Sequence, residues 1–172
     1  MKHIYIALLL SSFAAPTLAA QGSDSCATAS AISGQGSFGY DNTLATTGTD
    51  GQAEALCYQF GSSAVDNDIW FAWTSDFTGN AEISTCGGTS DDSKIAAYPG
   101  TCPATPGSVL ACNDDTCGLQ STITIAATTG TTYLIQVGNF PGATANTTGT
   151  FTITEDAPVL NPSNGHYYDY IA

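Results

Sequence analysis

The chain has 172 residues, of which 42% are hydrophobic and only 10% are charged, and its formal net charge is −13. Beyond residue 20, Lys94 is the only lysine or arginine and stands against all fifteen acidic residues, so the charge of the exported part is near −14. One cation cannot neutralise a row of phosphates, which excludes nucleic acid as a partner, and the same charge opposes binding to anionic membrane surfaces.

Residues 1–19 predict a secretory signal peptide. A short basic start precedes an apolar run over residues 4–10, and the small residues Thr17 and Ala19 fit cleavage after Ala19, with Ala20 as the alternative. The apolar run is too short to cross about 30 Å of hydrocarbon. We therefore expect a protein exported through a Sec-type signal, secreted or held at the cell surface, and not inserted in the membrane after cleavage.

The strand pattern that follows predicts an all-β fold. Short segments with apolar residues at every second position, separated by Gly, Asn, Asp, Pro and Thr turns, predict about eight strands. They cover residues 36–40, 67–74, 81–86, 93–98, 108–112, 121–127, 131–138 and 149–154. No amphipathic helix is predicted. We expect one disulfide-stabilised antiparallel β-sandwich, of the jelly-roll or Ig-like kind, over residues 20–157, and a linker over residues 158–172.

Six cysteines in an exported chain favour three disulfides over free thiols or metal ligands. They are Cys26, Cys57, Cys86, Cys102, Cys112 and Cys117. Zinc is disfavoured because only one close cysteine pair is present and the single histidine of the exported part, His166, lies far from it. Fifteen connectivities are open. The expected set joins Cys102 to Cys112 across a Pro- and Gly-rich hairpin, Cys86 to Cys117, and Cys26 to Cys57.

The acidic turn framed by Cys112 and Cys117 is the most specific candidate site. Its residues Asn113, Asp114 and Asp115 would meet Asp91 and Asp92 if Cys86 pairs with Cys117, and calcium prefers six to eight such oxygen ligands. The sequence therefore predicts a calcium site at these five residues. The alternative is a solvated turn, since Asn and Asp are favoured in turns without any ligand.

Several runs of the chain resemble the bacterial pre-peptidase C-terminal (PPC)-like β-sandwich domain, in that family's order. They are residues 24–29, 67–71, 84–87, 93–98, 110–115 and 132–137. The resemblance implies a non-catalytic module of secreted and cell-surface proteins, some members of which bind calcium or collagen. Residues 164–168 in turn resemble the start of a C-type lectin-like domain. This implies that the chain is part of a longer multidomain protein.

Three functions are therefore compared. The favoured one is a non-catalytic accessory module for adhesion or ligand binding, with calcium as its expected cofactor and an extracellular glycan or protein as its ligand. Tyr40, Tyr58 and Tyr98 are the candidates for stacking on sugars, against the alternative that they pack in the sandwich. The second function is a structural spacer. The third is a small carboxylate-dependent glycoside hydrolase using a pair such as Asp66 and Asp68.

Overall fold

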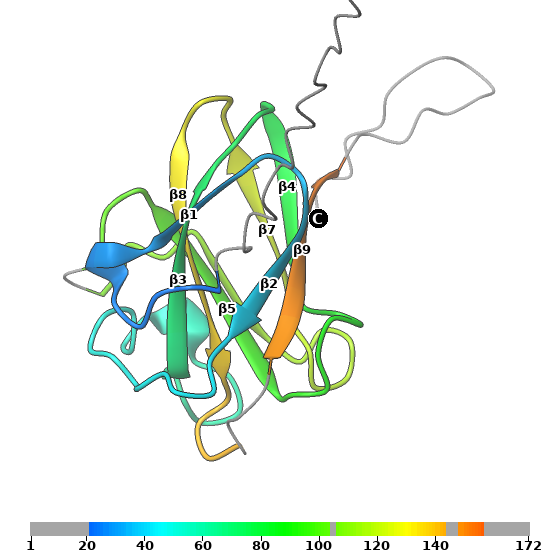
Figure 1. Ribbon diagram of the computed structural model, residues 1–172. Coiled ribbons are helices and arrows are strands. Elements are labelled where there is room, and N and C mark those ends of the chain that lie inside the picture. The colour runs from blue at the N-terminus through cyan, green and yellow to red at the C-terminus, as the bar shows by residue number, and fades with distance from the viewer. Residues whose placement is uncertain (1–20, 104–105, 144–147, 157–172) are drawn as a thin grey trace, which may run out of the picture.

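The computed structural model describes residues 21–103, 106–143 and 148–156, so the predicted signal peptide, the linker, the lectin-like segment and His166 lie outside it. The described chain forms two β-sheets that pack face to face (Figure 1). The five-stranded sheet has the order β1-β3-β8-β5-β6 and the four-stranded sheet the order β2-β9-β4-β7. The strands are β1 (Ser30–Ser33), β2 (Gly36–Asp41), β3 (Asp66–Thr74), β4 (Gly79–Ser84), β5 (Ser93–Pro99), β6 (Ala111–Asp114), β7 (Thr122–Ala127), β8 (Thr132–Asn139) and β9 (Thr148–Asp156).

The predicted all-β sandwich is confirmed, with one strand more than expected. All eight predicted strands are present, and β1 is the ninth. Its sequence, Ser-Ala-Ile-Ser, has little strand preference, and it is held by parallel pairing with β3, whereas the other strand pairs are antiparallel. Two 3-10 turns, η1 (Cys26–Thr28) and η2 (Ala55–Cys57), are the only helical elements in the described ranges.

The main core lies between the two sheets. On β3, Ile69, Phe71 and Trp73 point into it, as the alternation predicts, and they meet the buried residues of β9 from the opposite sheet. The rings of Phe71 and Phe151 pack edge to face with centroids 5.0 Å apart. Burying such a side chain contributes about 1.5–3 kcal/mol, so this layer is the main source of stability.

The outer face of the five-stranded sheet is also buried, which the sequence does not predict. A second cluster of buried residues covers it, including Trp70, Tyr98 and Leu134. The segment between β2 and β3 lies over this face, since Gly48 and Asp50 hydrogen-bond to side chains that project from the sheet. Because both faces are covered, β5 and β8 are buried almost throughout instead of alternating. Polar residues on the outer face therefore lie inside the protein.

Three disulfides are present, and one of the three predicted pairs is correct. Cys86 pairs with Cys117 as expected, but Cys26 pairs with Cys102 and Cys57 with Cys112.

The expected Cys102–Cys112 pair fails because of strand register. Cys112 lies opposite Ala96 in the pairing of β6 with β5. Cys102 follows Ala96 by six residues, which span roughly 20 Å in an extended chain. The expected Cys26–Cys57 pair fails because the two cysteines lie over different strands. The turn η1 packs on β3 and η2 on β6, and β8 and β5 lie between those strands. Both observed pairs instead fasten covering segments to the outer face of the five-stranded sheet.

No helix among the described residues is long and apolar enough to span a bilayer.

Candidate functional site

The candidate site begins with a charged pair on adjacent strands. Lys94 of β5 and Asp114 of β6 are direct cross-strand partners, so both side chains project on the outer face of the five-stranded sheet. The Lys94 Nζ atom lies 3.7 Å from Asp114 Oδ2. Lys94 is 0% exposed and Asp114 is 4% exposed. The strand expected to end at residue 112 therefore continues through Asp114, and the turn begins two residues later than predicted.

The turn after β6 is held in place by several contacts. Asp115 adopts φ 63°, a left-handed conformation that Asp tolerates better than most residues. The Cys86–Cys117 disulfide ties the turn to the segment after β4, and the Ser93 N–H donates to the Leu119 carbonyl at 2.8 Å. These contacts bring the two acidic segments together, for the reason that the sequence suggested.

Three carboxylates meet where these segments join. Each of Asp92, Asp114 and Asp115 offers one oxygen, and these oxygens all lie within 4.8 Å of one another. Four buried oxygens of this cluster have no hydrogen-bond partner, namely Asp92 Oδ1, both oxygens of Asp114 and Asp115 Oδ1. Buried polar atoms are nearly always paired, so this set of acceptors is suited to a cation. We call these three residues the acidic cluster.

The local electrostatics match this geometry. Burial raises the pKa of Asp114 to about 6, and the nearby Lys94 opposes that shift. Burial also raises the pKa of Asp92, and the charge of Asp115 adds to that rise. Burial lowers the pKa of Lys94, against the effect of Asp114. Each charged form is therefore disfavoured by desolvation, and the carboxylates are further disfavoured by mutual repulsion. The attraction of Lys94 to Asp114 and to Asp92 opposes both effects.

Two of the five predicted ligands do not join the acidic cluster. The Asn113 Oδ1 atom accepts hydrogen bonds from the Thr116 hydroxyl and from the Thr122 N–H, the latter at 3.3 Å, so Asn113 shapes the turn. Asp91 is buried beside Asn139, whose side chain hydrogen-bonds to it and partly offsets the rise of its pKa on burial. The structure thus brings Asp92, Asp114 and Asp115 together and places Asp91 and Asn113 outside the acidic cluster.

Lys94 is the residue of this site that the sequence reading missed. Period-two alternation placed it on the polar face of its strand, but that face is covered. A usable signal was present, since the only lysine or arginine of residues 21–172 stands in the run Ser-Lys-Ile-Ala-Ala-Tyr, among small and apolar residues.

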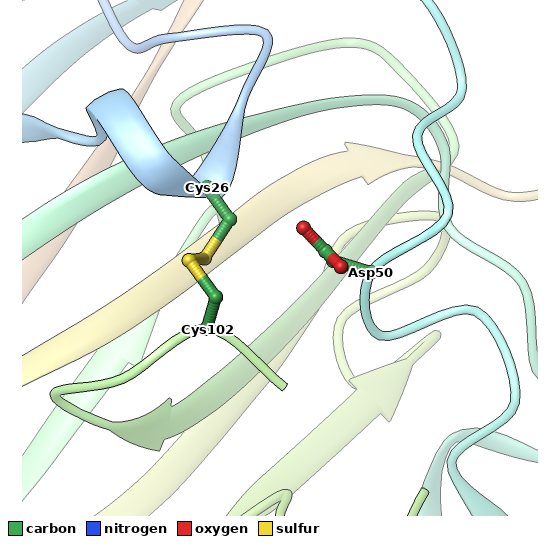
Figure 2. A group of neighbouring side chains, drawn as sticks. All are labelled: Cys26, Asp50 and Cys102. Carbon is green, nitrogen blue, oxygen red and sulfur yellow. A yellow bond between two sulfur atoms is a disulfide. The ribbon is translucent and has the colours of Figure 1, made fainter. Parts of the chain in front are cut away.

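A second group of potential ligand atoms lies at Cys26, Asp50 and Cys102. Figure 2 shows the Asp50 carboxylate beside the sulfurs of Cys26 and Cys102, which are joined in a disulfide. Metal ions bind cysteine as the thiolate, which a disulfide does not offer. This group therefore contributes to the fold and is not a metal site in the oxidised protein.

Among the other candidate residues from the sequence, Asp68 and two of the three tyrosines are buried. Asp68 is fully buried and accepts three hydrogen bonds, so its carboxylate serves the structure of the outer face. Tyr40 and Tyr98 are buried in the two clusters of the core. Tyr58 is 66% exposed and is the only one of the three tyrosines open to a ligand.

An exposed apolar segment adjoins the acidic cluster. Leu56, Tyr58 and Phe60 are all exposed, and Phe60, at 71%, adopts φ 49° in the turn. A bulky residue is strained in this conformation, and such strain is concentrated at functional sites. The segment is fastened to β6 by Cys57–Cys112, and the Lys94 ammonium donates to the Ser62 carbonyl at 3.0 Å. The exposed aromatics therefore lie on a turn that is fastened to β6 and to Lys94.

Comparisons of the chain with protein-family models, with curated proteins and with solved structures each returned no match.

Proposed function

We propose that this protein is a non-catalytic exported module that binds an extracellular glycan or protein, and that a calcium ion at Asp92, Asp114 and Asp115 orders its binding surface. One observation carries the proposal. Asp114 is almost fully buried, neither of its oxygens accepts a hydrogen bond, and its carboxylate lies against two further carboxylates. The resemblance to PPC-like domains supports the same function, since some members bind calcium.

The charge of the site fits a divalent cation. Three carboxylates and the Lys94 ammonium together carry −2 when all are ionised. The rest of the protein is acidic as well. Calcium takes six to eight oxygens at about 2.3–2.6 Å and accepts carboxylates together with carbonyls and water. Three carboxylates supply three to six of these ligands, depending on whether each binds through one oxygen or two.

The ligand surface in this proposal is the exposed segment of Leu56, Tyr58 and Phe60. Aromatic side chains contribute large contact areas at low entropic cost, and they stack on sugars or pack against apolar groups of a protein. The net charge near −14 opposes anionic ligands, so a neutral glycan or an uncharged or basic protein surface is favoured.

Calcium titration by calorimetry, combined with thermal unfolding in calcium and in chelator, tests the cation site. We expect saturable binding and a higher melting temperature in calcium, because a ligand that binds only the folded state stabilises it. Both effects should be lost in the Asp92→Asn, Asp115→Asn double variant, which keeps the shape of the side chains. Glu82→Gln is the matched control, since Glu82 is exposed on β4 in the other sheet. Wild-type protein without heat of binding or thermal shift would refute the calcium site.

The ligand surface is tested separately, by screening immobilised glycans and collagen with wild-type protein and with a Tyr58→Ala, Phe60→Ala variant. Saturable binding that is lost in the variant supports the proposal. Absence of any binding favours the structural spacer, and turnover of a glycan would favour the hydrolase.

A further inference from the structure

The pair Lys94 and Asp114 is buried but makes few hydrogen bonds. Both side chains are buried, yet Lys94 Nζ makes one hydrogen bond, to the Ser62 carbonyl, and Asp114 accepts none. The separation of 3.7 Å between Nζ and Oδ2 is too long for a good charge-assisted hydrogen bond. A buried ion pair with such geometry does not recover the free energy of desolvating its two charges.

The contacts of Lys94 fix the position of its amino group. Its Nζ lies 5.6 Å from the centroid of the Phe140 ring and donates a hydrogen bond to the Ser62 carbonyl at 3.0 Å. These contacts hold the amino group beside Asp114, with Nζ 3.7 Å from Oδ2.

From this geometry we infer that Lys94 and Asp114 react to form an intramolecular isopeptide bond, which joins β5 covalently to β6. The strands hold the two groups as direct cross-strand partners, so the reaction is intramolecular and needs only a small rotation of the side chains. Water is largely excluded from the site because both side chains are buried.

The reaction is a condensation. The reaction begins with the transfer of one proton from the Lys94 ammonium to the Asp114 carboxylate. The lone pair of Nζ then attacks Cγ of Asp114, and the new N–C bond forms as one C–O bond breaks. The hydroxyl leaves with one proton from the amine as a water molecule. No atom is oxidised or reduced, and no further reactant is required.

Asp92 is the residue placed to relay the proton. It stands two residues before Lys94, in the segment that leads into β5. Its carboxylate oxygen lies within 4.8 Å of an oxygen of Asp114, and its Oδ1 has no hydrogen-bond partner. It can accept a proton from the attacking nitrogen and return it to the departing hydroxyl.

This inference does not depend on the proposed calcium site. The bond would remove one positive and one negative charge together, so Asp92 and Asp115 would still carry −2, and the new amide would keep one oxygen able to bind calcium. Covalent mass decides the isopeptide bond, whereas heat of binding decides the calcium site, so either proposal can fail alone.

The composition of the exported part gives a direct test. Lys94 is its only lysine or arginine, and trypsin cleaves after a lysine only when the side chain is free. The mature protein is denatured, reduced and alkylated, its intact mass is measured, and it is digested with trypsin. We expect a mass lower by one water molecule and resistance to cleavage after Lys94.

Variants assign the reaction to these residues. Lys94→Gln and Asp114→Ala should show the full mass, and Asp92→Asn, which keeps both reacting groups, should leave them unjoined. Asp91→Asn is the matched control, since Asp91 lies outside the acidic cluster, and it should form the bond. Full wild-type mass with complete cleavage after Lys94 would overturn the inference, even if every variant failed to fold. So would a water loss that persists in Lys94→Gln.

Discussion

Asp68 shows how a single carboxylate is used inside this protein. Its Oδ1 accepts the Gly48 N–H at 2.8 Å, and its Oδ2 accepts Trp70 Nε1–H at 2.7 Å and Gln136 Nε2–H at 2.9 Å. Burial raises the pKa of Asp68, although these hydrogen bonds oppose the shift. The residue therefore fastens the covering segment to β3 and β8 and retains protons more strongly in the folded state than in the unfolded state.

Replacing Asp68 with Asn should destabilise the protein, by about 1–3 kcal/mol at pH 7, because an amide group would face buried donors. The difference from wild type should increase as the pH falls from neutral towards 3.8. A carboxyl group with a raised folded-state pKa contributes stability below its unfolded pKa and loses it as the pH rises through its folded pKa. Denaturant unfolding of both proteins measures this difference in the free energy of unfolding, between about pH 4, near the usual pKa of Asp, and about pH 7. A difference that shrinks on acidification would contradict the assigned direction.

At the scale of single residues, the acidic cluster was partly predictable. Asp114 and Asp115 could be placed near Asp92 because the expected Cys86–Cys117 disulfide draws the turn towards the segment that follows Cys86. Asn113 lies outside the cluster because alternation along β6 turns its side chain away from that of Asp114, and that geometry depends on where the strand ends.

At the scale of elements, the disulfides decide how the covering segments are held. Cys57–Cys112 links η2 to β6 across 55 residues, and Cys26–Cys102 links η1 to the segment after β5 across 76 residues. Both bonds close longer loops than the pairs expected from the sequence. On the chain-entropy model each restricts the unfolded chain more strongly than a short hairpin bond would.

Removal of the Cys57–Cys112 bond in a Cys57→Ala, Cys112→Ala variant should lower the free energy of unfolding by about 4 kcal/mol. For a domain of this size, that corresponds to a fall of the melting temperature of roughly 10 °C. The inner core between the sheets should persist, so far-ultraviolet circular dichroism should keep its β-sheet signal. Mass spectrometry of non-reduced fragments checks the pairing first. Fragments linked through Cys102 and Cys112 would contradict the connectivity described here.

The inner strands were predictable and the outer layer was not, for a physical reason. The inner face repeats every second residue, as in Ile69, Phe71 and Trp73, and this period is local. The outer face is buried by the irregular segment between β2 and β3, whose contacts with Gln136 and Tyr98 span many residues. Such long-range contacts leave no periodic pattern in the sequence, so the alternation along the strand placed Lys94 on a polar, solvent-exposed face.

At the scale of the whole molecule, residues 21–172 contain fifteen acidic residues and one lysine, so repulsion between like charges acts throughout this part of the chain. Repulsion among exposed carboxylates disfavours the compact state, and salt screens it, since the Debye length falls from about 30 Å at 0.01 M to about 8 Å at 0.15 M.

The melting temperature in the presence of chelator should therefore rise with sodium chloride over this range. Choline chloride at equal ionic strength should give the same rise, because screening does not depend on a specific cation. Differential scanning calorimetry in the two salts measures both series. A melting temperature that does not change with salt would show that the repulsion is not significant, and a rise with sodium alone would indicate a sodium site.

The position of β9 has a consequence for the folding of a newly made chain. Of the strands that the structure describes it is the last in sequence, yet it lies inside the four-stranded sheet, between β2 and β4 (Figure 1). It also supplies Phe151 and Ile153 to the inner core. Because a chain is synthesised from its N-terminus, this strand becomes available after the other eight. Until then β2 and β4 have no common partner, and the inner core is open on one side. The sandwich can therefore close only after residue 156 has been made, and it does not fold strand by strand during synthesis.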